Sequence, residues 1–281
     1  MTTLITGFNG KTGFEVAKKA KSAGLDFKCA VRDTEKAQAE FGSEFSFTLL
    51  DFTLPETFVQ AFNGVDRIFL IYPPGEGIEF ERFVEKAKEL SIKQIVYLSI
   101  KDVQFMPFIH HFKNEKLIKK TGIPYTFIRA GYFMQNLNDF LLQELKERQR
   151  IFVPAGKGKT SFVDARDLAD IAVLALTNPS HHHNKSYVIT GNEALSFYEA
   201  AERMTTILQL PIVYTDPSVK EFKQWMLSQG ADPSFINIVT GIHFPTKLGL
   251  AKGISDDFEK VTGKKPSSID QYIADFKQYW L

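Results

Sequence analysis

Three glycines near the N-terminus have a spacing that is suited to phosphate binding. They form a G-x-x-G-x-x-G pattern directly after a short apolar run and directly before a helical pattern. Glycine lets such a turn adopt positive φ and lets the backbone approach a pyrophosphate closely, while the following helix offers free N–H groups. A glycine-rich turn without a ligand is the alternative, but the strand–helix context favours a dinucleotide loop. The loop consists of Gly7, Phe8, Asn9, Gly10, Lys11, Thr12 and Gly13.

The end of the second expected strand bears on the choice of cofactor. An acid at this point accepts hydrogen bonds from the ribose hydroxyls of NAD, whereas a guanidinium suits the 2′-phosphate of NADP. The strand ends in Val31, Arg32 and Asp33, and Lys11 adds a second cation in the loop. Asp33 is an argument for the unphosphorylated ribose, and Arg32 as a solvated surface charge is the structural alternative. The pattern as a whole favours NADPH.

Further candidates lie where the other expected strands end, because ligands of open α/β sheets bind outside the carboxyl ends of the strands. We expect Phe52 to pack on the adenine and the hydroxyl of Ser99 to reach the substrate or the nicotinamide. Beyond the glycine loop, the candidate cofactor residues are Arg32, Asp51, Phe52, Tyr72, Pro73, Pro74, Ser99, Gly131, Tyr132 and Phe133. The candidate substrate pocket is formed by Tyr132, Phe133 and Asn136.

A histidine and a glutamate follow the fifth expected strand. His111 and Glu115 are four residues apart, so that they share one face of the helix expected there. Together with Ser99 they are the candidate catalytic residues, since a histidine can donate a proton near neutral pH. The alternative, which we favour, is that His111 only shapes the pocket, because hydride transfer to an electron-poor acceptor needs little acid assistance.

Alternating strand-like and helix-like segments must position these residues. Nearly continuous apolar strands separated by helical patterns indicate a parallel sheet that helices cover on both faces. The sequence therefore predicts an α/β fold with a Rossmann-type doubly wound sheet in residues 1–150. A smaller mixed α/β substrate-binding part is expected in residues 151–281, with its chain interleaved with the first domain. The expected strands are 4–6, 27–31, 45–50, 67–72, 94–99 and 125–129.

The composition narrows the classes of partner. Lys and Arg number 34 against 33 Asp and Glu, so no concentrated basic face is expected and nucleic acid is not an expected partner. No stretch is long enough to span a bilayer and no signal-peptide pattern is seen, so the cytoplasm is the expected compartment. Cys29 is the single cysteine, and a metal site is not expected at His181–His183. The 26 phenylalanines favour a Phe-rich core over a Phe-lined pocket.

Several of these segments together resemble the NmrA-like family of atypical short-chain dehydrogenase/reductases. The resemblance covers nearly the whole chain and implies a Rossmann domain with a small C-terminal substrate domain. The family includes reductases and also redox sensors that bind NADP without turnover. The superfamily's Tyr-x-x-x-Lys pair is not found after Ser99, and the His-x-x-x-Glu arrangement instead resembles the family's NADPH-dependent quinone oxidoreductases. The segments that carry the resemblance are 7–13, 31–33, 97–99, 126–136, 190–196 and 261–266.

Two functions stay open at this point. The first is an NADPH-dependent oxidoreductase that transfers hydride to a small, planar, electron-poor acceptor such as a quinone. The second is a non-catalytic NADP(H)-sensing regulatory protein that binds a partner protein. The missing Tyr-x-x-x-Lys pair favours the sensor, whereas the apolar segment 132–134 with Phe140 favours the enzyme because it can wall a substrate pocket. We expect the oxidoreductase, and we make no prediction of the oligomeric state.

Overall fold

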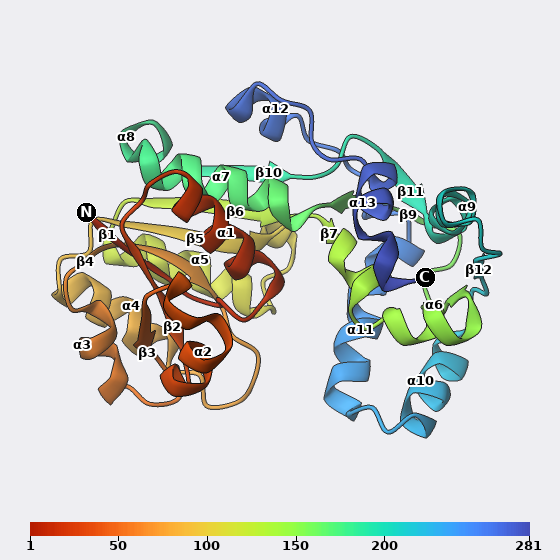
Figure 1. Cartoon of the computed structure of the whole chain (residues 1–281), viewed down its shortest axis with the longest axis horizontal. Coiled ribbons are helices and arrows are strands. Elements are labelled where there is room, and N and C mark those ends of the chain that lie inside the picture. Colours follow the sequence, from red (N-terminus) through yellow and green to blue (C-terminus); the bar gives the residue numbers. More distant parts are fainter. The chain divides into compact units, whose positions relative to one another are not determined.

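The computed structural model describes all residues, Met1–Leu281, and divides them into two compact units (Figure 1). The first unit consists of Met1–Ala130 and Ala165–Ile189, and the second of Gly131–Asp164 and Thr190–Leu281. This division differs from the expected boundary at residue 150. The chain leaves the first unit at Ala130 and returns to it for one more helix and strand, which a linear division of the sequence does not capture.

A seven-stranded sheet with the order β10-β6-β5-β4-β1-β2-β3 forms the centre of the first unit. Every strand pair in it is parallel. This confirms the predicted Rossmann-type sheet, and the strand order reverses between β1 and β4, where ligands of such sheets bind. The strands are β1 (Thr2–Ile5), β2 (Phe27–Val31), β3 (Phe47–Leu49), β4 (Val65–Ile71), β5 (Gln94–Ile100), β6 (Tyr125–Ala130) and β10 (Lys185–Ile189).

Helices flank this sheet. One pair is formed by α1 and α7, whereas α3, α4 and α5 pack against one another in sequence order. The short helix α8 includes His181 and His182 and begins at Pro179, because a proline at the first helical position favours a helical turn. The helices are α1 (Lys11–Ser22), α2 (Thr34–Phe41), α3 (Glu56–Phe62), α4 (Phe80–Glu89), α5 (His110–Thr121), α7 (Ala165–Thr177) and α8 (Pro179–His182).

Phenylalanine rings account for much of the core of the first unit. The ring of Phe8 is fully buried. It lies between 5.0 and 5.6 Å, centroid to centroid, from the rings of Phe14, Phe41, Phe45 and Phe47 in edge-to-face arrangements. Such pairs stabilise a core beyond their buried area. The expectation of a Phe-rich core is confirmed for these rings.

Two small sheets and several helices form the second unit. In the sheet β11-β9-β7, β11 (Ala194–Ser196) is antiparallel to β9 (Lys159–Val163), and β7 (Tyr132–Phe133) is parallel to it. A second, two-stranded sheet pairs β12 (Val213–Tyr214) with β8 (Arg150–Ile151). The helices are α6 (Leu142–Arg148), α9 (Phe197–Leu208), α10 (Val219–Ser228), α11 (Pro233–Lys247), α12 (Asp257–Thr262) and α13 (Ile269–Phe276).

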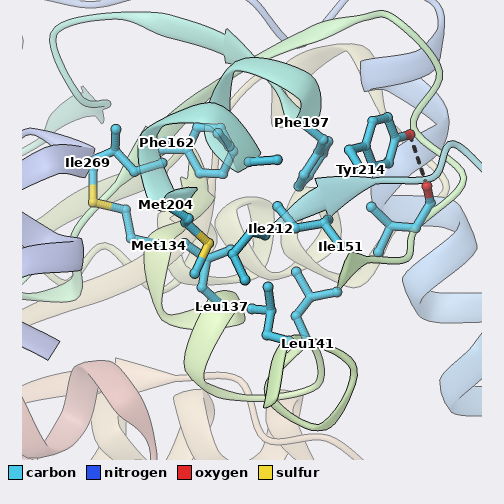
Figure 2. Close-up of a cluster of buried hydrophobic side chains, with 14 of the residues drawn as sticks. Met134, Leu137, Leu141, Ile151, Phe162, Phe197, Met204, Ile212, Tyr214 and Ile269 are labelled. Carbon is cyan, nitrogen blue, oxygen red and sulfur yellow. Dashed lines mark hydrogen bonds between the residues drawn. The ribbon is translucent and has the colours of Figure 1, made fainter. Parts of the chain in front are cut away.

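The second unit has a hydrophobic core of its own, in which aliphatic, methionine and aromatic side chains from its strands and helices meet (Figure 2). The Tyr214 hydroxyl donates to the Val153 carbonyl at 2.9 Å, so the polar tip of this buried ring is satisfied. No helix of either unit is long and apolar enough to cross a membrane. Core members include Met134, Leu137, Leu141, Ile151, Phe162, Phe197, Met204 and Ile212.

Candidate functional site

The glycine loop joins β1 to α1 at the point where the strand order reverses. Gly7 has a φ of +68°, which favours glycine, and its carbonyl accepts a hydrogen bond from the Gly10 N–H at 2.9 Å. A Cβ on Gly13 would lie 2.1 Å from the Gly7 oxygen. Gly7 and Gly13 are therefore needed for the loop to pack against the first turn of α1, whether or not a ligand is bound.

Gly10 has a different role in this loop. It is the N-cap of α1, and no side chain caps this helix, so the first N–H groups have no intrahelical partner. A Cβ on Gly10 would lie 3.3 Å from the Gly7 oxygen, a tight contact that a small shift relieves. The steric constraint on a side chain is therefore weaker at Gly10 than at Gly13. Because Gly10 has no side chain, a pyrophosphate could approach the backbone N–H groups at the start of α1 closely.

Charged side chains follow β2 and β3 at the same edge of the sheet. Arg32 is exposed, whereas the Asp33 carboxylate accepts the Lys36 N–H at 2.9 Å and is the N-cap of α2. The acid that complicated the choice of cofactor therefore caps a helix. The pKa of Asp51 is lowered, first by the Thr53 N–H that donates to it at 2.8 Å and to a smaller extent by the Arg32 charge.

Two predicted cofactor residues have their rings in the core. The Phe8 ring is fully buried, and the Phe52 ring packs against Phe83 and Phe58 with centroid distances of 4.7 and 6.3 Å. This placement does not support the expectation that Phe52 packs on an adenine. Its burial has a simple physical cause, because α3 and α4 present aromatic partners directly beneath the strand end. Only the loop backbone at Phe8 is available to a ligand.

Tyr72 directly follows β4, and Ser99 is the penultimate residue of β5, the neighbouring strand of the sheet. The Tyr72 ring stacks on His110 with 5.1 Å between centroids, and the prolines Pro73 and Pro74 continue the chain along the surface. Ser99 is 1% exposed and its Oγ has no hydrogen-bond partner in the protein.

The ring of His111 is positioned by Tyr97 and Asn114, which were not among the predicted site residues. Its Nδ1 lies 2.8 Å from the Tyr97 hydroxyl, and the same hydroxyl accepts a hydrogen bond from Asn114 Nδ2 at 3.0 Å. Burial lowers the pKa of His111 to about 4. The histidine is therefore neutral at pH 7. Tyr97 lies two residues before Ser99 and therefore on the same face of the strand. This spacing was the sequence signal that could have selected it.

The third candidate catalytic residue forms a buried ion pair. Both oxygens of Glu115 accept hydrogen bonds from Arg129, from Nε at 3.0 Å and from Nη2 at 2.7 Å. In such a two-point pair both carboxylate oxygens are engaged by the guanidinium. The geometry thus supports a role for Glu115 in fixing α5 against β6.

The remaining predicted residues lie in the second unit. Gly131, Tyr132, Phe133 and Asn136 all follow the point where the chain leaves the first unit. Tyr132 belongs to the core of the second unit, and its hydroxyl lies 3.1 Å from Nε2 of the fully buried His243. Tyr132 thus packs inside this unit, in contrast to the open pocket wall that we expected. His243 was not anticipated, because nothing in the local sequence distinguishes it from a surface helix residue.

These features define a class of protein. A doubly wound parallel sheet, a glycine loop at the switch point and an uncapped helix N-terminus are those of a dinucleotide-binding Rossmann domain. The chain belongs to the NmrA-like family, whose sequence model matches residues 1–273. The resemblance found in the sequence is thereby confirmed.

Three relatives illustrate the likeness. An NAD(P)H azoreductase of Xenophilus azovorans is 30% identical over 277 residues, which cover 96% of each chain. The structure of the Citrobacter sp. triphenylmethane reductase complexed with NADP(H) is 26% identical, with a TM-score of 0.86 over 98% of this chain and 100% of that one. An NADPH-dependent quinone oxidoreductase of Escherichia coli complexed with NADPH is similar in fold, with a TM-score of 0.86, 21% identity and coverage of 99% and 100%.

Proposed function

We propose that the protein is an NADPH-dependent oxidoreductase that transfers hydride to a small, planar, electron-poor acceptor such as a quinone. Its coarser class, an NAD(P)H-dependent oxidoreductase, is supported by the NmrA-like family and by relatives described as an azoreductase and a triphenylmethane reductase. The single observation that carries the proposal is the glycine loop at the switch point, with its uncapped helix and exposed Arg32.

The residues of the first unit fit this cofactor. The first turn of α1 and the bare backbone at Gly10 would hold the pyrophosphate, and Arg32 would hold the 2′-phosphate. Arg32 directly follows β2 and is exposed, so its guanidinium is accessible to a ligand. The neighbouring Asp33 carboxylate accepts the Lys36 N–H.

The proposed reaction requires the protein to orient the reactants, and it requires no acid–base catalysis by a side chain. Bound NADPH supplies the hydride, and the protein holds the acceptor beside it and excludes water. A quinone that accepts hydride becomes a hydroquinone anion, which takes its second proton from solvent. No residue needs to change its protonation state, which agrees with a neutral His111 and with a Glu115 that is ion-paired.

The proposal is tested by following NADPH absorbance in the presence of a benzoquinone, a naphthoquinone and an azo dye. We expect NADPH oxidation that depends on the acceptor and saturates with both substrates. The kcat/KM should be higher with NADPH than with NADH. A Gly10→Val variant that stays folded should lose the activity, and this variant separates enzymatic oxidation from direct reaction of NADPH with the quinone. Tight calorimetric binding of NADPH with no oxidation by any acceptor would instead support the regulatory, NADP(H)-sensing alternative.

A further inference from the structure

The hydrogen bonds beneath His111 determine which ring nitrogen carries its proton. The Tyr97 hydroxyl accepts from Asn114 Nδ2 at 3.0 Å and lies 2.8 Å from His111 Nδ1. Burial raises the pKa of Tyr97, so the hydroxyl keeps its proton. An amide nitrogen can only donate, so the single hydroxyl proton can be used only toward His111. If Nδ1 also carried a proton, the buried hydroxyl would have two donors facing it and no acceptor for its own proton.

The surroundings of His111 also keep it uncharged. Tyr72, Tyr97, His110 and Glu115 are the titratable groups that face it, and the Glu115 carboxylate is already paired with a guanidinium. His111 is the second residue of α5, whose first turn contains no acid, so the positive end of the helix dipole also disfavours an imidazolium. With Nδ1 accepting the tyrosine proton, the remaining ring proton is on Nε2. This atom has no hydrogen-bond partner in the protein, and the side chain is only partly buried.

We propose that His111 is a fixed, neutral hydrogen-bond donor through Nε2–H, and that Tyr97 and Asn114 are positioning residues that set its tautomer. The consequence of this assignment for acceptor selectivity rests on the proposed function. The site selects acceptors with an uncharged atom that accepts a hydrogen bond, such as a quinone carbonyl oxygen or an azo nitrogen. The donor strengthens its bond as hydride transfer places negative charge on that atom, and the proton itself stays on Nε2.

The tautomer can be observed directly by nitrogen NMR of the full chain labelled with ¹⁵N-histidine. His111 is assigned by comparison with His111→Gln. We expect a protonated Nε2, a bare Nδ1 and no charging as the pH falls from neutral toward 5. In Tyr97→Phe the two tautomers should become mixed. Tyr187→Phe is the matched control, because the Tyr187 hydroxyl lies 2.9 Å from His182 Nδ1 in the same unit and its loss should change only that histidine.

Two NMR results would overturn the proposal. One is a wild-type His111 with its proton on Nδ1, and the other is an imidazolium at pH 6 to 7. Either result is obtained without substrate or turnover. The assignment of the tautomer therefore stands or falls independently of the proposed oxidoreductase activity.

The functional consequence is tested with two kinds of acceptor. A naphthoquinone presents carbonyl oxygens, whereas a cationic triphenylmethane dye accepts hydride at a carbon that has no such acceptor atom. We expect His111→Phe to lower kcat/KM for the quinone about tenfold, the worth of one hydrogen bond to a developing charge, and to leave the dye nearly unchanged. Tyr97→Phe should act in the same direction but more weakly.

The selectivity part of the proposal is contradicted by an equal loss for both acceptors, since that result would show a purely steric role for His111. If the wild-type protein reduces neither acceptor, it is the proposed function that fails. The NMR assignment is unaffected by that outcome. The failure of the inference and the failure of the proposed function are therefore distinguishable.

Discussion

Arg32 and Asp33 are neighbours in the sequence, but the structure gives them different tasks. The Asp33 side chain turns back to the Lys36 N–H and stabilises the start of α2, while the Arg32 side chain stays exposed beyond β2. A carboxylate that accepts a backbone N–H at a helix N-cap is a typical stabilising contact. One oxygen of the acid is therefore already engaged, and we propose that the guanidinium sets the preference for the phosphorylated cofactor.

Removal of this guanidinium should reduce NADPH affinity selectively. We expect Arg32→Ala to weaken NADPH binding by about 1.5–3 kcal/mol, the range for hydrogen bonds to charged groups, and to change NADH binding little. Isothermal titration calorimetry with both cofactors measures the difference. Lys120→Ala, which removes an exposed positive charge at the C-terminal end of α5, is the control and should change neither affinity. Equal affinities of the wild type for the two cofactors would rule out this role.

The glycine loop shows how an element can constrain three similar residues in different ways. Gly7 needs its positive φ, and Gly13 needs to be bare because its Cβ would lie 2.1 Å from the Gly7 oxygen. At Gly10 a Cβ makes a single tight contact, 3.3 Å from the same oxygen. The spacing in the sequence treats the three as equivalent. Only the positions of the backbone atoms separate Gly7 and Gly13, which the loop itself requires, from Gly10, which we propose is required for binding.

Substitutions in this loop should therefore separate folding from binding. We expect Gly13→Ala to displace the loop and lower both the melting temperature and NADPH affinity, since its Cβ would meet backbone at 2.1 Å. Gly10→Val should fold and yet bind neither cofactor. Thermal unfolding with and without NADPH measures both effects. The matched control is Gly241→Ala in α11, where a Cβ meets nothing within 4 Å and the added helix propensity should stabilise slightly. Retained NADPH binding in a folded Gly10→Val protein would contradict the assignment.

At the scale of the whole molecule, each unit holds a neutral histidine among aromatic rings, partly buried in the first unit and fully buried in the second. In the first unit this is His111, and in the second it is His243, whose Nδ1 donates to the Val239 carbonyl at 2.7 Å while Nε2 faces the Tyr132 hydroxyl. Burial lowers the pKa of both to about 4. Protonation of either residue in the folded chain is therefore unfavourable, and this links the stability of the molecule to pH.

The sign of this linkage gives a test. The folded pKa of His243 is about 4 and the unfolded value is about 6.5, so the unfolded chain binds more protons between these values. The contribution of His243 is fully present above pH 6.5 and is lost as the pH falls toward 4, by about 3 kcal/mol in total. Urea unfolding between pH 7 and 5 should show about 2 kcal/mol of this loss. His243→Phe should flatten the slope, and the exposed His181→Phe should not. An unchanged slope in His243→Phe would remove this histidine from the linkage.

Much of the fold follows from the sequence because its determinants are local. Apolar runs with turns between them predicted six of the strands to within about three residues, and the spacing of the glycines between a strand and a helix predicted the dinucleotide loop. The family resemblance implied a small C-terminal domain, and its role in substrate binding stays a prediction. Arg32 and Ser99 could be selected because the carboxyl ends of parallel strands always meet at one edge of the sheet.

The rest was decided by the tertiary structure, because it depends on partners that lie far apart along the chain. Whether the Phe52 ring meets a ligand or the core depends on Phe83, and whether Glu115 is free depends on Arg129. The proton position on His111 depends on a tyrosine hydroxyl 14 residues away in sequence. A sequence pattern shows which side chains share a face, but hydrogen-bond direction and burial are set only when elements pack together, and these two properties determine the chemistry of the site.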